Sequence, residues 1–190
     1  MRWASAIAAA LVVGYFTCAI RVFLPPQQRQ LIALKNRVAI PRQPDFDPAA
    51  TLDALLAPGE DRDRWSPQRA AVVEGYVVRV VEAGVELSNC LSLTRRDIHL
   101  ELALALDAPP ADRLIAEVTP RMRDRLTTGE DWSTRALTRS LVGRRVRVSG
   151  WLMFDREHQG EAENTRPGRA ANWRRTAWEI HPVTSIHLLP

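Results

Sequence analysis

Two segments near the C-terminus alternate apolar and polar side chains, which is the pattern of a β-strand with one buried face. Residues 144–155 form the first segment, whose apolar positions are Val146, Val148, Leu152 and Phe154. Residues 176–189 form the second, and Pro182 within it predicts a bulge or an edge position. Between them, residues 156–175 hold glycine, proline and asparagine with charges of both signs. The pattern predicts two strands joined by a polar loop.

Three more strands are predicted upstream. Residues 72–81 are rich in β-branched residues, and Gly75 in their middle predicts a bulge or sharp coil that bends a long first strand around a barrel. Residues 85–89 are expected to form a short second strand. Residues 98–106 alternate isoleucine or leucine with histidine, glutamate and alanine, which predicts a third strand with one apolar face.

A helix is expected between the third and fourth strands. Residues 134–141 follow Asp131, a residue suited to an N-cap, and end just before Gly143. Residues 114–118 predict only an accessory strand. Three strands, a helix and two strands is the order of the oligonucleotide/oligosaccharide-binding (OB) barrel. The predicted fold is therefore mainly β, a small five-stranded OB-like antiparallel barrel, with another small antiparallel barrel as the alternative.

The N-terminus predicts a membrane segment. Residues 3–20 carry no charge, and the prolines at 25 and 26 end any helix. We therefore assign residues 1–24 to a signal anchor or transmembrane helix; a cleaved signal peptide or a buried helix are the alternatives. Basic residues behind the segment argue for a cytoplasmic C-terminal part, whereas a Sec-type anchor places that part outside. We favour the inner membrane with a periplasmic C-terminal domain.

Residues 25–69 contain seven of the 13 prolines and are predicted to be a tether between the membrane and a domain over residues 70–190. Two short helices are expected in the tether. One covers residues 27–36. The other begins at Asp47 as its cap, and its apolar stripe consists of Leu52, Leu55 and Leu56.

Charge and cysteine content exclude several classes of protein. The net charge is +4, but residues 70–190 hold 17 basic and 16 acidic residues, which is a weak field for phosphate binding. The sequence contains no phosphate loop, dinucleotide fingerprint, Cys-x-x-Cys pair or Gly-x-Ser-x-Gly elbow. Cys18 lies in the apolar segment and Cys90 is the only other cysteine, so no disulfide is expected within the mature domain.

Two pairs of residues could hold a metal ion. His99 and Glu101 lie two apart on one predicted strand, as do Glu179 and His181 on another, so each pair points to a single face. If the two faces meet, with His158 arriving from the loop, they supply nitrogen and oxygen ligands for zinc or manganese. Such an ion could activate water for hydrolysis. The alternative is that these are ordinary polar residues on a solvated face and that no cofactor is bound.

Aromatic and basic residues suggest a ligand surface. Those on the predicted strands are Tyr76, Trp151 and Trp178 with Arg145 and Arg147. Such side chains can stack on bases or sugars. The near-neutral charge favours a sugar, peptide or protein over nucleic acid, and core packing of the aromatic rings is the alternative. Glu117 and Arg121 are expected to form a structural ion pair near the barrel mouth.

Several motifs resemble those of an uncharacterised group of bacterial proteins with an OB-like barrel. They lie between residue 70 and the C-terminus and read EGY, SNC, DxHxE, EVTPR, SGWLMFDxxH and WEIHPVT. The group has a histidine directly after the cysteine of the SNC motif, where this chain has Leu91 after Cys90. The resemblance implies a barrel domain and brings no activity with it.

The leading hypothesis is a non-enzymatic, membrane-tethered binding module that presents the face bearing His99, Glu101, Glu179 and His181 to an envelope protein or an oligosaccharide. The first alternative is a metal-dependent hydrolase acting on phosphodiesters. The second is a protein that binds single-stranded nucleic acid.

Overall fold

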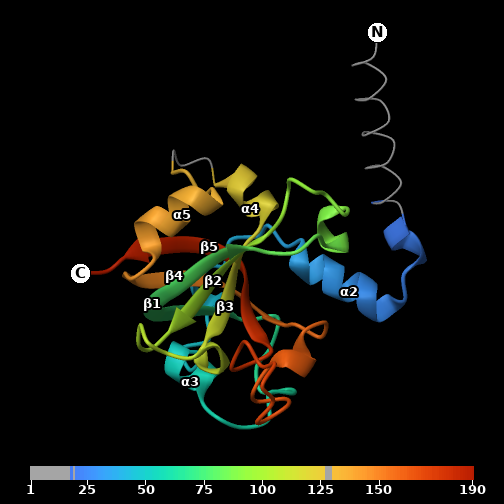
Figure 1. The fold of residues 1–190 in the computed structure, drawn as a ribbon. Coiled ribbons are helices and arrows are strands. Elements are labelled where there is room, and N and C mark those ends of the chain that lie inside the picture. Colours follow the sequence, from blue (N-terminus) through green and yellow to red (C-terminus); the bar gives the residue numbers. More distant parts are fainter. Residues whose placement is uncertain (1–17, 19, 127–129) are drawn as a thin grey trace.

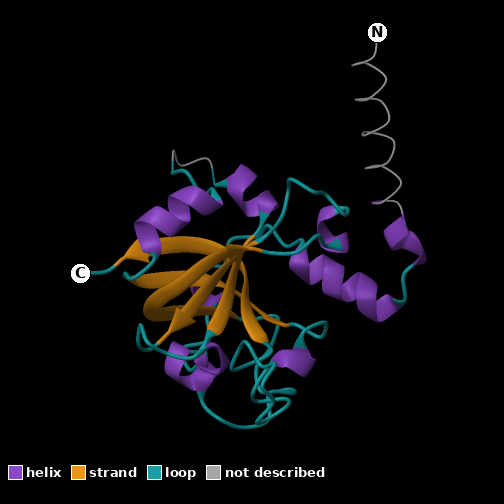
Figure 2. Cartoon of the chain, in the orientation of Figure 1, coloured by secondary structure: helices purple, strands orange, loops and turns teal. Residues whose placement is uncertain are grey.

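Five strands close into a barrel in the computed structural model, which describes residues 18, 20–126 and 130–190 (Figures 1 and 2). The strands are β1 (Ala70–Glu82), β2 (Ile98–Ala103), β3 (Leu114–Val118), β4 (Arg145–Phe154) and β5 (Trp178–Leu188). The prediction of a mainly β, five-stranded barrel is confirmed. The last two strands and the helix over residues 134–141 also form where the sequence predicts them.

The strand order around the barrel is β1-β2-β3-β5-β4. Four of the pairs are antiparallel, whereas β3 and β5 are parallel, with Ile115 opposite Glu179. The prediction of a wholly antiparallel barrel is therefore wrong. Parallel neighbours need a long connection, and here α4 (Pro120–Arg125), α5 (Thr134–Leu141) and β4 lie between them in the chain.

One predicted strand does not form, and another has a larger role than predicted. Residues 85–89 do not pair with the barrel, because the polar side chains of Ser88 and Asn89 bond locally and to Arg121 within the 3₁₀ turn η3 (Leu87–Asn89). Conversely, the predicted accessory strand is β3, the third strand of the barrel, and all its residues are buried. Its short length conceals this role in the sequence.

The long first strand is shared by two neighbours, as its composition predicts. Residues 70–76 pair with β4, and residues 76–82 pair with β2. The bulge lies between Val77 and Arg79 rather than at Gly75. At Gly75 an added Cβ would lie 2.3 Å from Leu52 and 2.8 Å from the Ala103 carbonyl oxygen, so glycine is needed there for close approach.

The remaining helical elements lie around the barrel. They are η1 (Ile20–Phe23), α2 (Pro26–Lys35), η2 (Gln43–Asp45), α3 (Leu52–Leu56), η4 (Pro110–Asp112) and η5 (Gln159–Glu161). Thr51, not Asp47, caps α3, and Ser133, not Asp131, caps α5. Figure 1 shows α3 and α5 on opposite sides of the barrel, and both add leucines to its core.

The segment predicted to be a tether packs against the barrel. Leu52, Leu55 and Leu56 belong to the same core as the barrel strands. The fully buried carboxylate of Asp61 accepts hydrogen bonds from the Ala177 backbone N–H at 2.8 Å and from the Asn164 side chain at 2.9 Å. These contacts hold residues 26–69 to the barrel and to the loop before β5.

A disulfide joins Cys18 to Cys90, so Cys90 of the barrel domain does find a partner, in the apolar N-terminal segment that the expectation had set aside. The 72-residue separation gives no sign of this contact in the sequence. It arises because α2 runs beside η3, as Figure 1 shows. No helix in the described part of the chain is long and apolar enough to cross a membrane. The predicted span falls on residues 1–24, most of which lie outside the described residues.

Candidate functional site

Four ionisable side chains project from the outer face of neighbouring strands. They are His99 on β2, Glu117 on β3, and Glu179 and His181 on β5. Each alternates along its strand with core residues such as Leu100, Ala116 and Ile180, which forces it outward. The register places His99 opposite Glu117 and brings β5 beside β3, so the four side chains meet. We call them, with Asp97, the polar centre.

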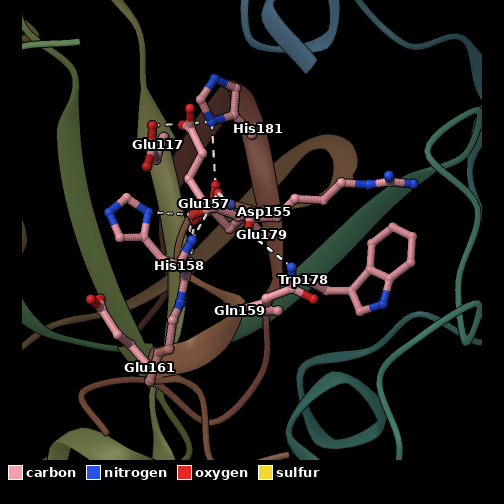
Figure 3. Close-up of polar contacts among 12 residues, drawn as sticks. Glu117, Asp155, Glu157, His158, Gln159, Glu161, Trp178, Glu179 and His181 are labelled. Atoms are coloured by element: carbon pink, nitrogen blue, oxygen red, sulfur yellow. Dashed lines mark hydrogen bonds and ion pairs between the residues drawn. The ribbon is translucent and has the colours of Figure 1, made fainter. Parts of the chain in front are cut away.

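Glu117 links the two imidazoles of the polar centre. Its Oε1 lies 2.9 Å from His99 Nε2, and its Oε2 lies 3.0 Å from His181 Nδ1. His181 Nδ1 is also 3.4 Å from Glu179 Oε2 (Figure 3). Since a carbonyl oxygen can only accept, the 3.2 Å contact between His181 Nε2 and the Lys35 carbonyl oxygen places a proton on Nε2. His181 therefore presents its Nδ1 to the two carboxylates.

Three segments cover this face of the barrel. The helix α2 contributes Lys35, whose Nζ lies 2.8 Å from Glu86 and 3.1 Å from Glu157. The loop over residues 83–97 contributes Asp97. The loop between β4 and β5 contributes Arg174, which pairs with Asp155 at 3.0 Å and also with Glu179. The cover is complete enough that the side chains of Glu117, Glu179 and His181 are at most 3 % exposed.

Burial and charge shift the pKa values of the polar centre. Burial by itself lowers the pKa of His181, but the carboxylates of Glu117 and Glu179 outweigh it and raise that pKa well above its usual value. Burial likewise disfavours ionised Glu117, yet His181 and His99 hold its pKa well below normal. Glu117 is therefore ionised at neutral pH.

Asp97 is a further buried carboxylic acid of the polar centre, close to Glu117 and His181. Burial and then the charge of Glu117 raise its pKa to about 6. Its Oδ1 has no hydrogen-bond partner among the described residues. Asp97, Glu117 and His181 each offer one ligand atom, and these atoms lie within 4.8 Å of one another. Carboxylate oxygens and an imidazole nitrogen are ligands for zinc or manganese.

Aromatic contacts fasten the β4–β5 loop over the polar centre. The Trp173 ring lies parallel to the His99 ring, with centroids 6.0 Å apart, and meets the His158 ring edge-on at 5.8 Å. His158 Nδ1 lies 2.7 Å from Asp155 Oδ2 (Figure 3). The hydrogen bond to Asp155 raises the pKa of His158 to about 9.

Three of the five residues predicted to bind metal are brought together: His99, Glu179 and His181. His158 lies at the rim of the polar centre and contacts Asp155 instead. Glu101 lies apart, because Arg113 at 2.7 Å and Arg79 at 3.3 Å pair with it. Since the covering segments bury the polar centre, the face is not presented to solvent in the way that the leading hypothesis expects.

The residues predicted to form a stacking surface do not lie on one face. Trp178 points into the core, whereas Trp151 packs on the outside under Arg37, whose guanidinium is 4.9 Å from its ring centroid. Arg145 and Arg147 are exposed and both pair with Glu74. Tyr76 is half-buried at the point where β1 changes partners.

Sequence reasoning did not assign Asp97, Lys35 or Arg174 to the predicted metal site, and it expected Glu117 to pair with Arg121. Arg121 does not pair with Glu117 but donates to Asn89 at 3.0 Å and to the Ser88 carbonyl oxygen at 3.1 Å. The signal for Glu117 was present, because it alternates with the apolar residues of β3. Because those residues were expected to form only an accessory strand, Glu117 was not included in the predicted metal site.

A cavity of about 580 Å³ opens between α2, residues 62–67 and the ends of β4 and β5. Aromatic rings and polar side chains share its lining, which comprises Trp65, Phe154 and Trp178 with Gln27, Gln30, Arg62, Asp63, Arg156 and Gln159, besides Leu31, Leu34 and Pro67. The indole N–H of Trp65 is buried and has no acceptor among the described residues. The cavity is the right size for a small ligand.

Comparisons of the chain with protein-family models, with curated proteins and with solved structures found no match.

Proposed function

We propose that the protein is a membrane-tethered, non-enzymatic binding module with an OB-like barrel, and that it binds an envelope oligosaccharide in the cavity beside α2. The mixed aromatic and polar lining of that cavity carries the proposal. Aromatic rings pack on the apolar faces of sugar rings, while amide, guanidinium and carboxylate groups bond to hydroxyls. The partly buried ring of Trp65 lines the cavity and is one such aromatic surface.

The strand order and the parallel β3–β5 pair support the OB-like assignment. Barrels of that type bind ligands on the β2–β3 face and at the flanking loops. Here that face carries the polar centre, and the chain's own loops cover it. We therefore assign the ligand to the neighbouring cavity, which the β4–β5 loop also lines through Arg156 and Gln159.

The disulfide supports a periplasmic location for the barrel. Disulfides persist in oxidising compartments and are rare in the cytosol. Together with the apolar residues 3–20, this favours an inner-membrane anchor with the barrel on the outer side.

The two alternatives have less support. A hydrolase needs its substrate to reach the metal. Here the carboxylates of Glu117 and Glu179 and the imidazole of His181 are all enclosed. The basic side chains predicted to contact nucleic acid, Arg145 and Arg147, are both paired with Glu74, which weakens their attraction for phosphate.

Isothermal titration of the full chain in detergent with N-acetylglucosamine oligosaccharides and with soluble peptidoglycan fragments tests the proposal. We expect binding to one of these glycans, and a loss of roughly tenfold or more in affinity for Trp65→Ala. Trp132→Ala is the matched control, because this partly buried tryptophan packs against the core away from the cavity. No binding of either glycan, or equal affinity in Trp65→Ala, would contradict the proposal.

A further inference from the structure

We infer that Asp97, Glu117 and His181 form a structural site for one divalent zinc or manganese ion. The site is separate from the cavity, so it stands independently of the proposed function. It differs from the metal site that the sequence suggests, because only His181 is common to both and Asp97 and Glu117 are its other two ligands. The inference depends on unpaired atoms, on the spacing of the ligand atoms and on the balance of charge.

The unpaired atoms form a coherent set. Among the described residues, the buried polar atoms without a hydrogen-bond partner include Asp97 Oδ1, Glu117 Oε2, Glu179 Oε2 and His181 Nδ1. All four belong to residues that are at most 3 % exposed. Buried polar atoms in native proteins are nearly always paired, and those that are not need an explanation. One ion bound by Asp97, Glu117 and His181 would pair three of these four atoms.

The spacing fits ligands of a common ion. Glu117 Oε2 and His181 Nδ1 lie 3.0 Å apart, yet their geometry does not make a hydrogen bond. With metal–ligand distances near 2.1 Å, adjacent ligand atoms are separated by roughly 3–3.4 Å and opposite ones by roughly 4 Å. The 4.8 Å limit that contains all three ligand atoms is close to that range.

His181 is held in the orientation of a metal ligand. Ligating imidazoles almost always donate their other ring N–H to a carbonyl or carboxylate, which fixes the ring and its tautomer. Here Nε2 donates to the Lys35 carbonyl oxygen at 3.2 Å, so the remaining nitrogen faces Glu117. Lys35 thereby supports the site through its backbone as well as through its charge.

The carboxylates in and around the polar centre outnumber the cations that pair with them, which favours a bound divalent cation. Six carboxylates lie in the polar centre or beside it: Glu86, Asp97, Glu117, Asp155, Glu157 and Glu179. The permanently charged cations within the cover are Lys35 and Arg174, and His158 adds a third when protonated by its pairing with Asp155. A divalent zinc or manganese ion held by Asp97, Glu117 and His181 would offset part of this negative charge. Because buried uncompensated charge is costly, this balance favours an ion.

A buried ion at this place would have a structural role. Asp97 ends the loop over residues 83–97, whereas Glu117 and His181 belong to β3 and β5. Binding all three would fix that loop to the barrel. The same loop carries Cys90 and contacts α2, so the ion would also steady the cover over the barrel face.

The experiment uses the full chain, purified in detergent without a chelator or a histidine tag. Elemental analysis should find about one equivalent of zinc or manganese. Removing the metal with EDTA should lower Tm by roughly 5–10 °C, and adding ZnCl₂ or MnCl₂ should restore it. Absence of metal, together with a Tm that neither EDTA nor either metal changes, would overturn the inference.

Asp97→Asn is the decisive variant, because it keeps the shape of the side chain and removes the anionic ligand. We expect its metal content to fall to background and its Tm to stop responding to metal. Glu101→Gln is the matched control: it makes the same change on β2, which begins directly after Asp97, at a carboxylate that pairs with Arg113 and Arg79, and it should keep its metal. Full metal content in Asp97→Asn would overturn the site. If Asp97→Asn does not fold, the EDTA response of the wild-type chain decides the question.

Discussion

The Lys35 ammonium group lies 2.8 Å from the Glu86 carboxylate, which joins the end of α2 to the loop before β2 across 51 residues of sequence. Burial opposes the charge on Lys35, but Glu117, Glu86, Asp155 and Glu179 together raise its pKa. The only lysine of the chain is thus a charged, buried anchor between the N-terminal segment and the barrel.

Lys35→Met should destabilise the fold strongly. It leaves Glu86 without its buried cation and removes positive charge from the polar centre, and breaking one side of a buried ion pair costs about 3–5 kcal/mol. Denaturant unfolding of the full chain in detergent measures this loss. Arg29→Met is the matched control, since Arg29 is exposed on the same helix, and it should change the free energy of unfolding by no more than about 0.5 kcal/mol. Equal stability of the two variants would contradict the prediction.

Stability should fall as the pH rises through about 9, because of His158. The hydrogen bond to Asp155 raises its pKa from 6.5 to about 9. A raised pKa stabilises the folded state fully below pH 6.5, and the contribution disappears as the pH passes the folded value. Since the side chain is 38 % exposed, solvent screening reduces the effect to about 1 kcal/mol.

The measurement for His158 is the free energy of unfolding between pH 6 and pH 10. His158→Gln should remove this part of the pH dependence, whereas His187→Gln, at an exposed position on β5, should keep the wild-type profile. An unchanged profile in His158→Gln would show that another group causes the slope.

Gly75→Ala should destabilise the fold if α3 packs on β1. The new methyl group would overlap Leu52 and the Ala103 carbonyl oxygen, and overpacking of this kind costs about 1–3 kcal/mol. Gly84→Ala is the control, because its Cβ would meet nothing within 4 Å. In a Leu52→Ala background the cost of Gly75→Ala should shrink, and a thermodynamic cycle measures this coupling. Costs that simply add would mean that the helix does not contact the strand.

The disulfide predicts that the barrel lies in an oxidising compartment. In chain isolated from cells and denatured at once, neither cysteine should react with a maleimide-polyethylene glycol reagent until a reductant is added. Cys90→Ser should leave Cys18 reactive without reductant, as the positive control. Two reactive thiols in the untreated wild-type chain would contradict both the disulfide and the periplasmic location.

The barrel and most of its strands could be predicted from local pattern. Period-two alternation is a property of neighbouring residues, so β4 and β5 form where Val146, Val148 and Ile180 indicate. The helix α5 follows from its apolar spacing and from Gly143 in the same way. The outward direction of His99, Glu179 and His181 also follows from alternation alone.

The composition of the polar centre depends on contacts between distant residues. Glu117 meets His181 only because β3 and β5 pair in parallel, and Asp97, Lys35 and Arg174 arrive from three covering segments. Local sequence encodes which way a side chain points from its strand, because the backbone sets that direction. Which charges it meets depends on strand order, register and the packing of loops, and these are decided by burial over the whole chain.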